Sequence, residues 1–447
     1  MAVLTPASIV AAPTPRSSRD GLRDTIKPNC APEYFWRYCK PVLSGLLDLA
    51  GGYSAAEKDS HLRFFHENCA QLLGPDPTGD RLMEQLIPVE MSVNISGDRE
   101  KGIVRFQMEP RSVTLGPHTS PTGDDPYGRK AVGALLDYFE HVIPGLDFKW
   151  SRELVDKFMV YEPVEVARLV AAEKTSLPVP IDVYQRCPQF NYAVDMMGGK
   201  RNMKIYSIPL AKSLAAERPA MDICFAAIRS LEPYGPELGP AADALQEFLQ
   251  KRCPGPMSCD YIAVDATDPK KSRVKLYISS NELNSFDFIR SVYTLGGIAM
   301  DETRLRGLEV LRSIWPLLLG VEEEKFSDSS SRPVKQLPFF LGCLYFGFEW
   351  RAGDDLPQVK LYLPLWQYHK TDRQIANAIE AVLDKLGRQE MSVAYSQHIA
   401  KTFAKADWDA GVSFHNQVSF AYSADTGPYL SIYYGLKPEN IAIDPQL

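Results

Sequence analysis

Two kinds of apolar spacing alternate along the chain. In some short segments every second residue is apolar, which is typical of a strand with one face in a core, and the pattern predicts ten strands in consecutive pairs. The pairs are 86–96 with 103–110, 190–197 with 204–209, 259–266 with 272–280, 339–350 with 359–364, and 416–423 with 430–435. Longer segments carry apolar residues every third or fourth position, which predicts helices. These are 33–50, 57–74, 129–143, 151–161, 216–233, 239–253, 301–320, 371–389 and 394–406.

The order of these elements predicts the fold. Helices precede each strand pair, so the chain reads as five repeats of the form ααββ, in the α+β class. Consecutive hairpins make the sheet antiparallel, and closure into a ten-stranded barrel removes the exposed edges. With helices covering the outside, the polar faces of the strands must line the lumen. We predict a disordered lead over residues 1–28 and a single barrel domain over 29–447.

A short polar motif recurs on the predicted strands. Arg273, Lys275 and Tyr277 occupy alternate positions and therefore share one strand face. A basic residue two positions before a tyrosine recurs in "KIYSIP" and "VKLYLP", while "LSIYYG" keeps only the tyrosine and "VRFQ" only the basic residue. The copies recur at intervals of about 70–100 residues, which indicates an internally repeated unit.

Composition narrows the class of protein. The 447 residues are 45% apolar and 23% charged with a net charge of −7, so nucleic acid is not an expected partner. No apolar run is long enough to span a bilayer, and the first residues lack the pattern of a signal peptide. Eight cysteines without a CxxC pair favour reduced thiols and a cytoplasmic location. The sequence leaves open whether the protein is a monomer or a homodimer.

Basic residues at matching positions of several strands predict an anion site inside the barrel. They are Arg105, Lys204, Arg273, Lys275 and Lys360. Buried like charges are costly unless an anion neutralises them, and an organic diphosphate fits five such groups. A simpler interpretation stays open, in which each cation pairs with a nearby acid or faces water.

Tyrosines and one glutamate complete the predicted chamber. Tyr206, Tyr277, Tyr362 and Tyr433 would ring it, and aromatic faces stabilise cations, although ordinary packing would also place tyrosines on strands. Glu90 lies in the otherwise apolar run "PVEMS" and needs a partner if buried. That partner is either a nearby Arg or Lys or an N–H or O–H group of a substrate.

The motifs "PVEMS", "VRFQMEP", "MKIYSIP", "RVKLYI", "VKLYLP" and "YLSIYY" resemble the fungal dimethylallyltryptophan-synthase family. The resemblance runs from about residue 30 to the end and implies aromatic prenyltransferases of the ABBA barrel type. It implies Glu90 as the group that binds the indole N–H, the five basic residues as diphosphate ligands and the four tyrosines as a shield around the prenyl cation. It also implies dimethylallyl diphosphate as co-substrate and no metal or other cofactor.

Three positions depart from the members that prenylate free tryptophan. Asn191 stands where those members carry a lysine base, Asp260 or Tyr261 stands near an arginine that holds the tryptophan carboxylate, and Gln417 replaces a tyrosine. We therefore expect Asn191 and Gln417 in the acceptor pocket and a neutral acceptor, such as a cyclic dipeptide, an indole alkaloid or a phenolic polyketide. The group that deprotonates the acceptor is left open.

Two other functions compete with prenyl transfer. A non-catalytic carrier barrel for an anionic or aromatic small molecule would explain the cations and the aromatic residues without Glu90. A phosphatase or another enzyme acting on a phosphorylated substrate is disfavoured, because the chain has no P-loop, GxGxxG or nucleophile motif.

Overall fold

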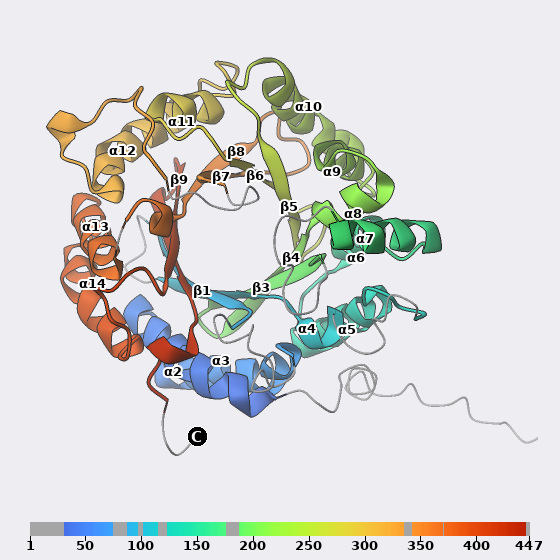
Figure 1. Cartoon of the computed structure of the whole chain (residues 1–447), viewed down its shortest axis with the longest axis horizontal. Helices are drawn as coiled ribbons and strands as arrows, with labels where there is room; N and C mark the ends of the chain where they lie inside the picture. Colours follow the sequence, from blue (N-terminus) through green and yellow to red (C-terminus); the bar gives the residue numbers. More distant parts are fainter. Residues whose placement is uncertain are drawn as a thin grey trace, which may run out of the picture.

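A closed antiparallel barrel of ten strands forms the centre of the molecule. The computed structural model describes residues 31–74, 87–96, 102–114, 123–175, 187–334, 342–369 and 371–443. Each strand pairs with its neighbours in sequence, and β1 pairs with β10 to close the ring. Figure 1 looks along the lumen and shows the helices arranged around the outside of the strands. The predicted fold class, an α+β barrel surrounded by helices, is confirmed.

The strands lie close to their predicted positions. They are β1 (Val89–Ser96), β2 (Ile103–Met108), β3 (Phe190–Met197), β4 (Lys200–Ser207), β5 (Ser258–Asp265), β6 (Val274–Ser280), β7 (Leu344–Trp350), β8 (Gln358–Leu363), β9 (His415–Ser423) and β10 (Gly427–Gly435). The predicted start of β7 at residue 339 lies outside the described residues, as does the predicted lead over 1–28.

Helices connect the strand pairs. They are α2 (Pro32–Ala50), α3 (Ala55–Asn68), α4 (Arg111–Thr114), α5 (Arg129–Val142), α6 (Lys149–Phe158), α7 (Pro163–Thr175), α8 (Pro209–Ala216), α9 (Ala220–Arg229), α10 (Gly235–Lys251), α11 (Phe286–Tyr293), α12 (Glu302–Leu319), α13 (Asp372–Lys385) and α14 (Gln389–Thr402). Helices α4, α7, α8 and α11 are absent from the sequence-based expectation. The number of ααββ repeats stays a prediction.

The unexpected helices are mostly short. Helices α8 and α11 have eight residues each, about two turns, which is too short to display the apolar spacing over a window of 11–18 residues. Helix α11 nevertheless has an N-cap, because the Ser285 hydroxyl accepts a hydrogen bond from the Phe288 N–H in the first turn.

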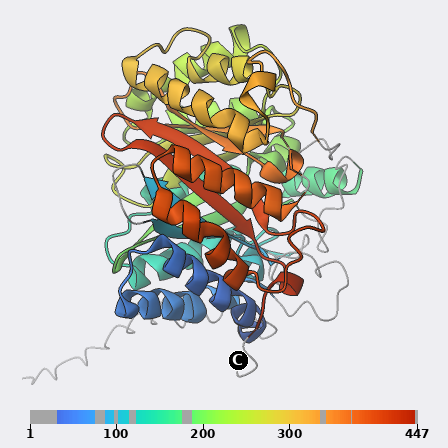
Figure 2. The same cartoon turned by 90° about the vertical axis from the view of Figure 1, so that its left-hand side faces the viewer.

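The hydrophobic core lies between the helices and the outer face of the barrel. On β1, Met91, Val93 and Ile95 point outward and are at most 5% exposed. The alternate residues of the same strand, among them Glu90 and Ser92, point into the lumen. Figure 2 shows α13 and α14 lying across the outside of the last strands. Stability thus rests on the outer layer, which leaves the lumen to polar side chains.

The antiparallel pairing gives the lumen two distinct ends. Every odd-numbered strand begins at the same end, which we call the Glu90 end because Glu90 is the second residue of β1. Every odd-numbered strand finishes at the other end, which we call the lysine end because Lys204 and Lys275 lie toward it on β4 and β6. Residues from distant parts of the sequence meet at each end.

Candidate active site

A cavity of about 530 Å³ occupies the lumen toward its Glu90 end. Its wall includes Glu90, Arg105 and Gln107 from β1 and β2, and Asn416 and Gln417 from β9. Tyrosines from six further strands, described below, supply most of its aromatic surface. The volume falls within the range of small-molecule sites, which bury most of a ligand's surface.

Four tyrosines form a continuous row across the cavity wall, which we call the tyrosine belt: Tyr206, Tyr277, Tyr362 and Tyr433. The ring centroids of successive members lie 5.8, 5.8 and 6.0 Å apart. Burial raises the pKa of every one of these hydroxyls, so they are neutral at physiological pH. The belt therefore presents ring faces without negative charge, as a shield for a carbocation requires.

The belt depends on a glycine. Gly347 of β7 lies between Tyr277 and Tyr362, and a β-carbon there would stand 3.2 Å from Cε2 of Tyr362 and 3.4 Å from Cε1 of Tyr277. The absent side chain lets the two rings approach each other. Tyr261, a further lumen residue, packs its ring 6.1 Å from that of Tyr277.

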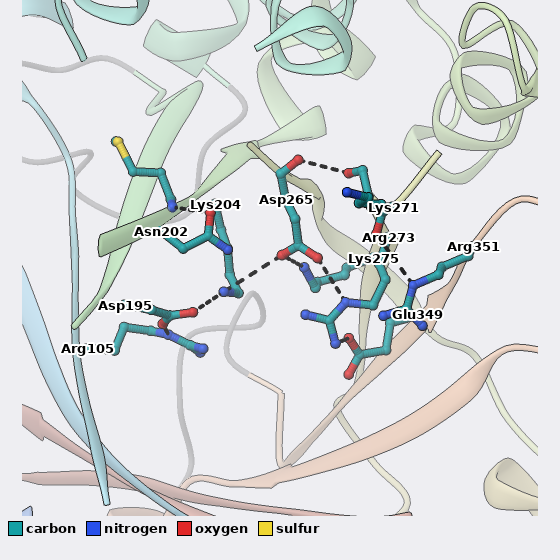
Figure 3. A network of polar contacts seen from close by, with 12 residues as sticks. Arg105, Asp195, Asn202, Lys204, Asp265, Lys271, Arg273, Lys275, Glu349 and Arg351 are labelled. Carbon is teal, nitrogen blue, oxygen red and sulfur yellow. Dashed lines mark hydrogen bonds and ion pairs between the residues drawn. The ribbon is translucent and has the colours of Figure 1, made fainter. Parts of the chain in front are cut away.

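The five predicted diphosphate ligands meet at the lysine end, where we call them the cation network. Figure 3 shows how four of them, Arg105, Lys204, Arg273 and Lys275, alternate with carboxylates. Arg105 and Lys204 both contact Asp195, and Lys204 Nζ also lies 3.7 Å from Asp265 Oδ1. Asp265 in turn contacts Lys275.

Arg273 extends this network to the next strand. Its Nε donates to Asp265 Oδ2 at 2.8 Å, and its Nη1 lies 2.9 Å from Glu349 Oε2. Burial opposes the ionisation of Asp265, but the surrounding cations outweigh it and hold the pKa of this carboxyl well below its usual range. Arg273 is the most exposed member, at 32% of its side chain.

Lys360 differs from the other four cations. Its ammonium donates to Ser431 Oγ at 3.2 Å and lies 4.6 Å above the ring of Tyr429 and 5.2 Å above that of Tyr362. Burial is the main reason that the pKa of Lys360 falls to about 7, and burial likewise lowers the pKa of Lys275 to about 7. An arriving anion would raise both values and hold these lysines charged.

The cation network itself carries more positive than negative charge. Among the described residues, its five cations face three carboxylates, Asp195, Asp265 and Glu349, so the fully ionised network has two more positive than negative charges. Local pairing with acids, the simpler interpretation of the sequence, thus holds for four of the cations. Pairing fixes their geometry, and the surplus suits an anionic ligand.

The three carboxylates were missed in the sequence, although their positions carry a signal. Each lies directly across the barrel sheet from a cation: Asp195 opposite Arg105, Asp265 opposite Lys204, and Glu349 opposite Lys275. Each also follows the strand alternation of the lumen-facing residues. Opposite charges at directly paired positions are the usual cross-strand combination.

Glu90 faces the cavity from the opposite end. Its Oε1 accepts a hydrogen bond of 2.9 Å from Asn416 Nδ2. Burial raises the pKa of Glu90 to about 7, while Asn416 and Gln417 oppose that shift. Near neutral pH this carboxyl therefore exists in both protonation states, as suits a group that exchanges a proton with a substrate.

A bulge in β9 directs Asn416 toward Glu90. Tyr433 pairs with Gln417 but Tyr434 pairs with His415, so Asn416 is the extra residue. Gly435 stands opposite Glu90 in the register, and a β-carbon there would lie 2.8 Å from Asn416 Oδ1. The glycine leaves the space that the Asn416 amide occupies.

The predicted site residues fall into three groups. Glu90, Arg105, Gln417 and the tyrosine belt line the cavity, and the other four members of the cation network lie beyond it toward the lysine end. Asn191 lies on β3 opposite Tyr206 but is not among the lining residues. The cavity wall also includes Tyr345, Trp366 and Asn416, which the sequence had not indicated.

The part of the chain that the structure describes contains no group of three or more His, Cys, Asp or Glu side chains placed to hold a metal ion. Within the same ranges, no helix combines the length and the apolar character needed to cross a membrane.

Comparison with known proteins places this geometry in context. The family model described as tryptophan dimethylallyltransferase matches residues 31–398. The O-glucose prenyltransferase PaPT of Phomopsis amygdali is 56% identical over 94% of this chain and 92% of its own length. The indole diterpene prenyltransferase terF of Tolypocladium album is 31% identical over 91% of this chain and 96% of its own.

Solved structures share the fold at lower sequence identity. AnaPT from Neosartorya fischeri has a TM-score of 0.75 with 23% identity, covering 95% of this chain and 99% of its own. NotF in complex with brevianamide F and DMSPP has a TM-score of 0.73 with 22% identity, covering 94% and 98%.

Proposed function

The chain belongs to the tryptophan dimethylallyltransferase family of prenyltransferases, and on that premise we propose that it transfers a dimethylallyl group from its diphosphate to a neutral acceptor. The observation that carries this proposal is the excess of positive charge at the lysine end, separated from Glu90 by the tyrosine belt. In one lumen, the cation network matches the diphosphate, the tyrosine belt matches the allyl group and the Glu90 end matches the acceptor.

The donor binds with its diphosphate at the cation network and its allyl group against the belt. Breaking the allylic C–O bond leaves the electron pair on the diphosphate, where Arg105, Lys275 and Lys360 stabilise the developing charge. The allyl cation is held against neutral tyrosine rings, which also exclude water from its path. We propose that the network supplies the positive charge for this step and that no metal is required.

The acceptor attacks from the Glu90 end. A nucleophilic atom held beside Glu90 forms the new bond to the allyl cation and releases its proton. With a pKa of about 7, Glu90 is ionised in a large fraction of molecules at neutral pH and serves as the base. Asn416 donates a hydrogen bond to Oε1 and Gln417 interacts with the same carboxyl group, so both amides hold Glu90 in place beside the acceptor.

The first candidate acceptor is a hydroxyl group of a glycoside. A relative that is 56% identical over 94% of this chain is named an O-glucose prenyltransferase. Gln107, Asn416 and Gln417 place neutral hydrogen-bonding groups beside Glu90 on the cavity wall, which also includes Lys437, and these groups fit a polar acceptor. Transfer to oxygen needs a base for the O–H proton, which is the role proposed for Glu90.

The second candidate is an indole carbon. The indole diterpene prenyltransferase terF and the indole prenyltransferase tdiB of Emericella nidulans are 31% and 30% identical to this chain. In this case Glu90 would bind the indole N–H and raise the electron density of the ring. Phenolic acceptors fit the same arrangement through their O–H group.

The test is product analysis by mass spectrometry. The full chain is incubated with dimethylallyl diphosphate and, separately, an aryl β-glucoside, indole, a tryptophan-containing cyclic dipeptide and a phenol, with and without EDTA. We expect a product with one added C5H8 unit and equal yield in EDTA. A strict requirement for Mg²⁺ contradicts the metal-free step. Tight binding of both ligands without product favours a carrier barrel instead.

We propose that the reaction takes place in the cytoplasm. The seven cysteines within the described residues are free thiols, which supports a cytoplasmic location. We propose that the active unit is a monomer or homodimer, since one chain supplies the whole lumen. Chromatography with light scattering distinguishes the two states.

A further inference from the structure

A buried carboxylate on α13, Asp372, binds the short segment that leads to Asn416. Asp372 is the first residue of this helix and has no exposed surface. Its Oδ2 accepts hydrogen bonds from the backbone N–H and the hydroxyl of Ser413, at 2.7 and 2.8 Å. Its Oδ1 accepts from the backbone N–H of His415 at 3.1 Å and from His415 Nδ1 at 2.8 Å. Four donors from two neighbouring residues thus converge on one side chain.

The segment fixed in this way, residues 413–416, forms part of the cavity wall. Ser413, His415 and Asn416 all line the cavity. Phe414 lies between them, and its carbonyl accepts a hydrogen bond of 2.9 Å from the Gly435 N–H. Asn416 comes next, as the extra residue of the β9 bulge. Because a bulged residue has no regular partner on the neighbouring strand, its position depends on the residues that precede and follow it.

Asp372 is suited to hold all four donors because it is ionised. Burial opposes its ionisation, but the hydrogen bonds from His415 and Ser413 outweigh burial and lower the pKa of this carboxyl. The first turn of a helix also favours a negative charge. An asparagine in its place would offer one acceptor oxygen and would turn an N–H₂ group toward the remaining donors.

His415 extends the contact to a second helix and a further strand. Burial lowers the pKa of His415, although Asp372 opposes the shift, so the ring is neutral at physiological pH. A neutral ring that donates through Nδ1 accepts through Nε2, and the Tyr395 hydroxyl of α14 lies 2.9 Å from that atom. The Tyr434 hydroxyl of β10 lies 3.0 Å from that of Tyr395. Residues of α13, α14 and β10 therefore fix the start of β9.

We propose that Asp372 is a positioning residue for the reaction, which acts by holding the Asn416 amide on the Glu90 carboxyl. The inference rests on the proposed function, in which Glu90 is the base, and adds a residue that is not part of the cavity wall. Asn416 Nδ2 lies 2.9 Å from Glu90 Oε1 in the structure. Loss of the Asp372 contacts lets the bulge relax and the amide move away.

The consequence is a change in the protonation of Glu90. The hydrogen bond from Asn416 favours the ionised carboxylate, so its loss raises the pKa of Glu90 above 7 and leaves less of the base at neutral pH. Gln417 interacts with the same carboxyl group and limits the effect. From the usual strength of such a hydrogen bond, we expect a rise of about 0.5–1 pH unit.

The other ionisable groups near the two carboxyls stay in place when Asp372 is replaced. Those that share the cavity wall with Glu90 are Arg105, Tyr261, Tyr277, Tyr345, Tyr433, His415 and Lys437. Those near Asp372 are His369, Tyr395, His415 and the ion pair of Arg373 with Asp409. Apart from His415, no residue of the first set forms a hydrogen bond or ion pair with Asp372 in the described ranges. The replacement therefore acts on Glu90 through residues 413–416.

The experiment compares Asp372→Asn with wild type in the full chain. Turnover is measured from pH 6 to pH 9 with dimethylallyl diphosphate and the member of the acceptor panel above that wild type converts fastest. We expect the midpoint on the acid side of the pH profile to rise by about 0.5–1 unit, so that turnover at pH 7 falls about two- to fivefold. The KM for the donor should stay within about twofold, because the cation network is untouched.

The matched control is Asp125→Asn. Asp125 is likewise buried, and its carboxylate accepts from the backbone N–H groups of Lys130 and Ala131 in the first turn of α5. Its replacement removes a comparable set of hydrogen bonds from the outer layer and should lower the Tm. It should leave the pH profile of turnover unchanged, because the first turn of α5 has no contact with β9.

A double-mutant cycle separates positioning from a general structural effect. Asn416→Ala alone should shift the profile as Asp372→Asn does, and the two together should shift it no further, because the amide that Asp372 holds is gone. Tyr395→Phe removes only the hydroxyl beside His415 Nε2 and should give a smaller shift in the same direction, which serves as the test if Asp372→Asn does not fold. An unshifted profile in the variant tested, or an equal shift with and without Asn416, overturns the inference.

The pKa of Glu90 can also be followed without turnover. The difference in Tm between a protein and its Glu90→Gln counterpart grows as the pH rises from 4.5 and levels off near the folded-state pKa of Glu90. Asp372→Asn should move this point upward by the same shift. If wild type prenylates no acceptor, prenyl transfer is refuted and this inference falls with it. If wild type does so but Asp372→Asn keeps both the profile and the levelling point, prenyl transfer stands and the positioning role is refuted.

Discussion

Replacing Glu90 by glutamine should make the protein more stable while it loses activity. The ordinary pKa of a glutamate is 4.5, and burial raises that of Glu90 to about 7. A tenfold change in an ionisation constant corresponds to about 1.4 kcal/mol, so the fold disfavours the ionised carboxylate by about 3 kcal/mol. Glutamine has nearly the same shape and cannot ionise, and its carbonyl can still accept from Asn416.

The sign of the pH dependence follows from the raised pKa. The contribution of Glu90 to the free energy of unfolding is present in full below pH 4.5, where its carboxyl is protonated in both the folded and the unfolded chain. This contribution is lost as the pH rises through 7. The glutamine variant does not lose it. Burying the new amide N–H₂ group offsets part of this difference. We therefore expect the free energy of unfolding of Glu90→Gln to exceed that of wild type by about 1–3 kcal/mol at pH 8 and by nothing near pH 4.5.

The assay is a thermal melt of wild type and Glu90→Gln at a series of pH values. For a chain of this size the gain corresponds to about 1–3 °C in Tm at pH 8. All other groups titrate equally in both proteins, so the difference between the two curves isolates Glu90. A difference that is constant from pH 5 to pH 8, or a variant that melts below wild type at pH 8, would refute the reasoning.

Activity should move in the opposite direction. If Glu90 is the base, its loss removes a contribution of about 10²–10⁴ in turnover, while binding of inorganic diphosphate at the far end of the lumen is unchanged. A gain in stability with a loss of turnover is characteristic of a residue retained for function.

Two further outcomes follow from the geometry of the site. The pKa values of Lys275 and Lys360 are lowered to about 7, so both side chains lose their charge as the pH rises from 7 to 9. Calorimetry should therefore show that inorganic diphosphate binds more weakly over this range and that its binding takes up protons from the buffer. An affinity independent of pH would contradict this prediction. Gly435→Ala places a β-carbon 2.8 Å from Asn416 Oδ1 and should displace the amide from Glu90, which should lower turnover and shift the pH profile of turnover. The control is Gly411→Ala, which has open space around the new β-carbon and should change neither turnover nor its pH profile.

The sequence predicted those parts of the site that follow strict alternation. Tyr206, Tyr277, Tyr362 and Tyr433 were placed on one face of their strands by a period of two, and the structure brings their rings together in one row. Closure of the barrel could also be argued from the number of hairpins, because open edges are unfavourable.

What the sequence could not reveal depends on pairing between strands. Asp195, Asp265 and Glu349 matter because they stand opposite particular cations, and this register is set by the closed sheet. Asn416 and Asp260 depend on bulges, where one extra residue reverses the alternation. A reading of every second residue assigns such side chains to the wrong face.

The position of the hydrophobic core explains why the lumen can be so polar. The outward residues of β1, such as Met91 and Val93, are fully buried against the helices, so folding is driven from the outer layer. The inner face can then hold a glutamate with a pKa near 7 and lysines in the same range, each of which a stability-driven core would exclude. The groups that cost folding energy gather at the two ends of one lumen, where a donor and an acceptor would meet. Their arrangement is therefore better explained by the reaction than by the fold.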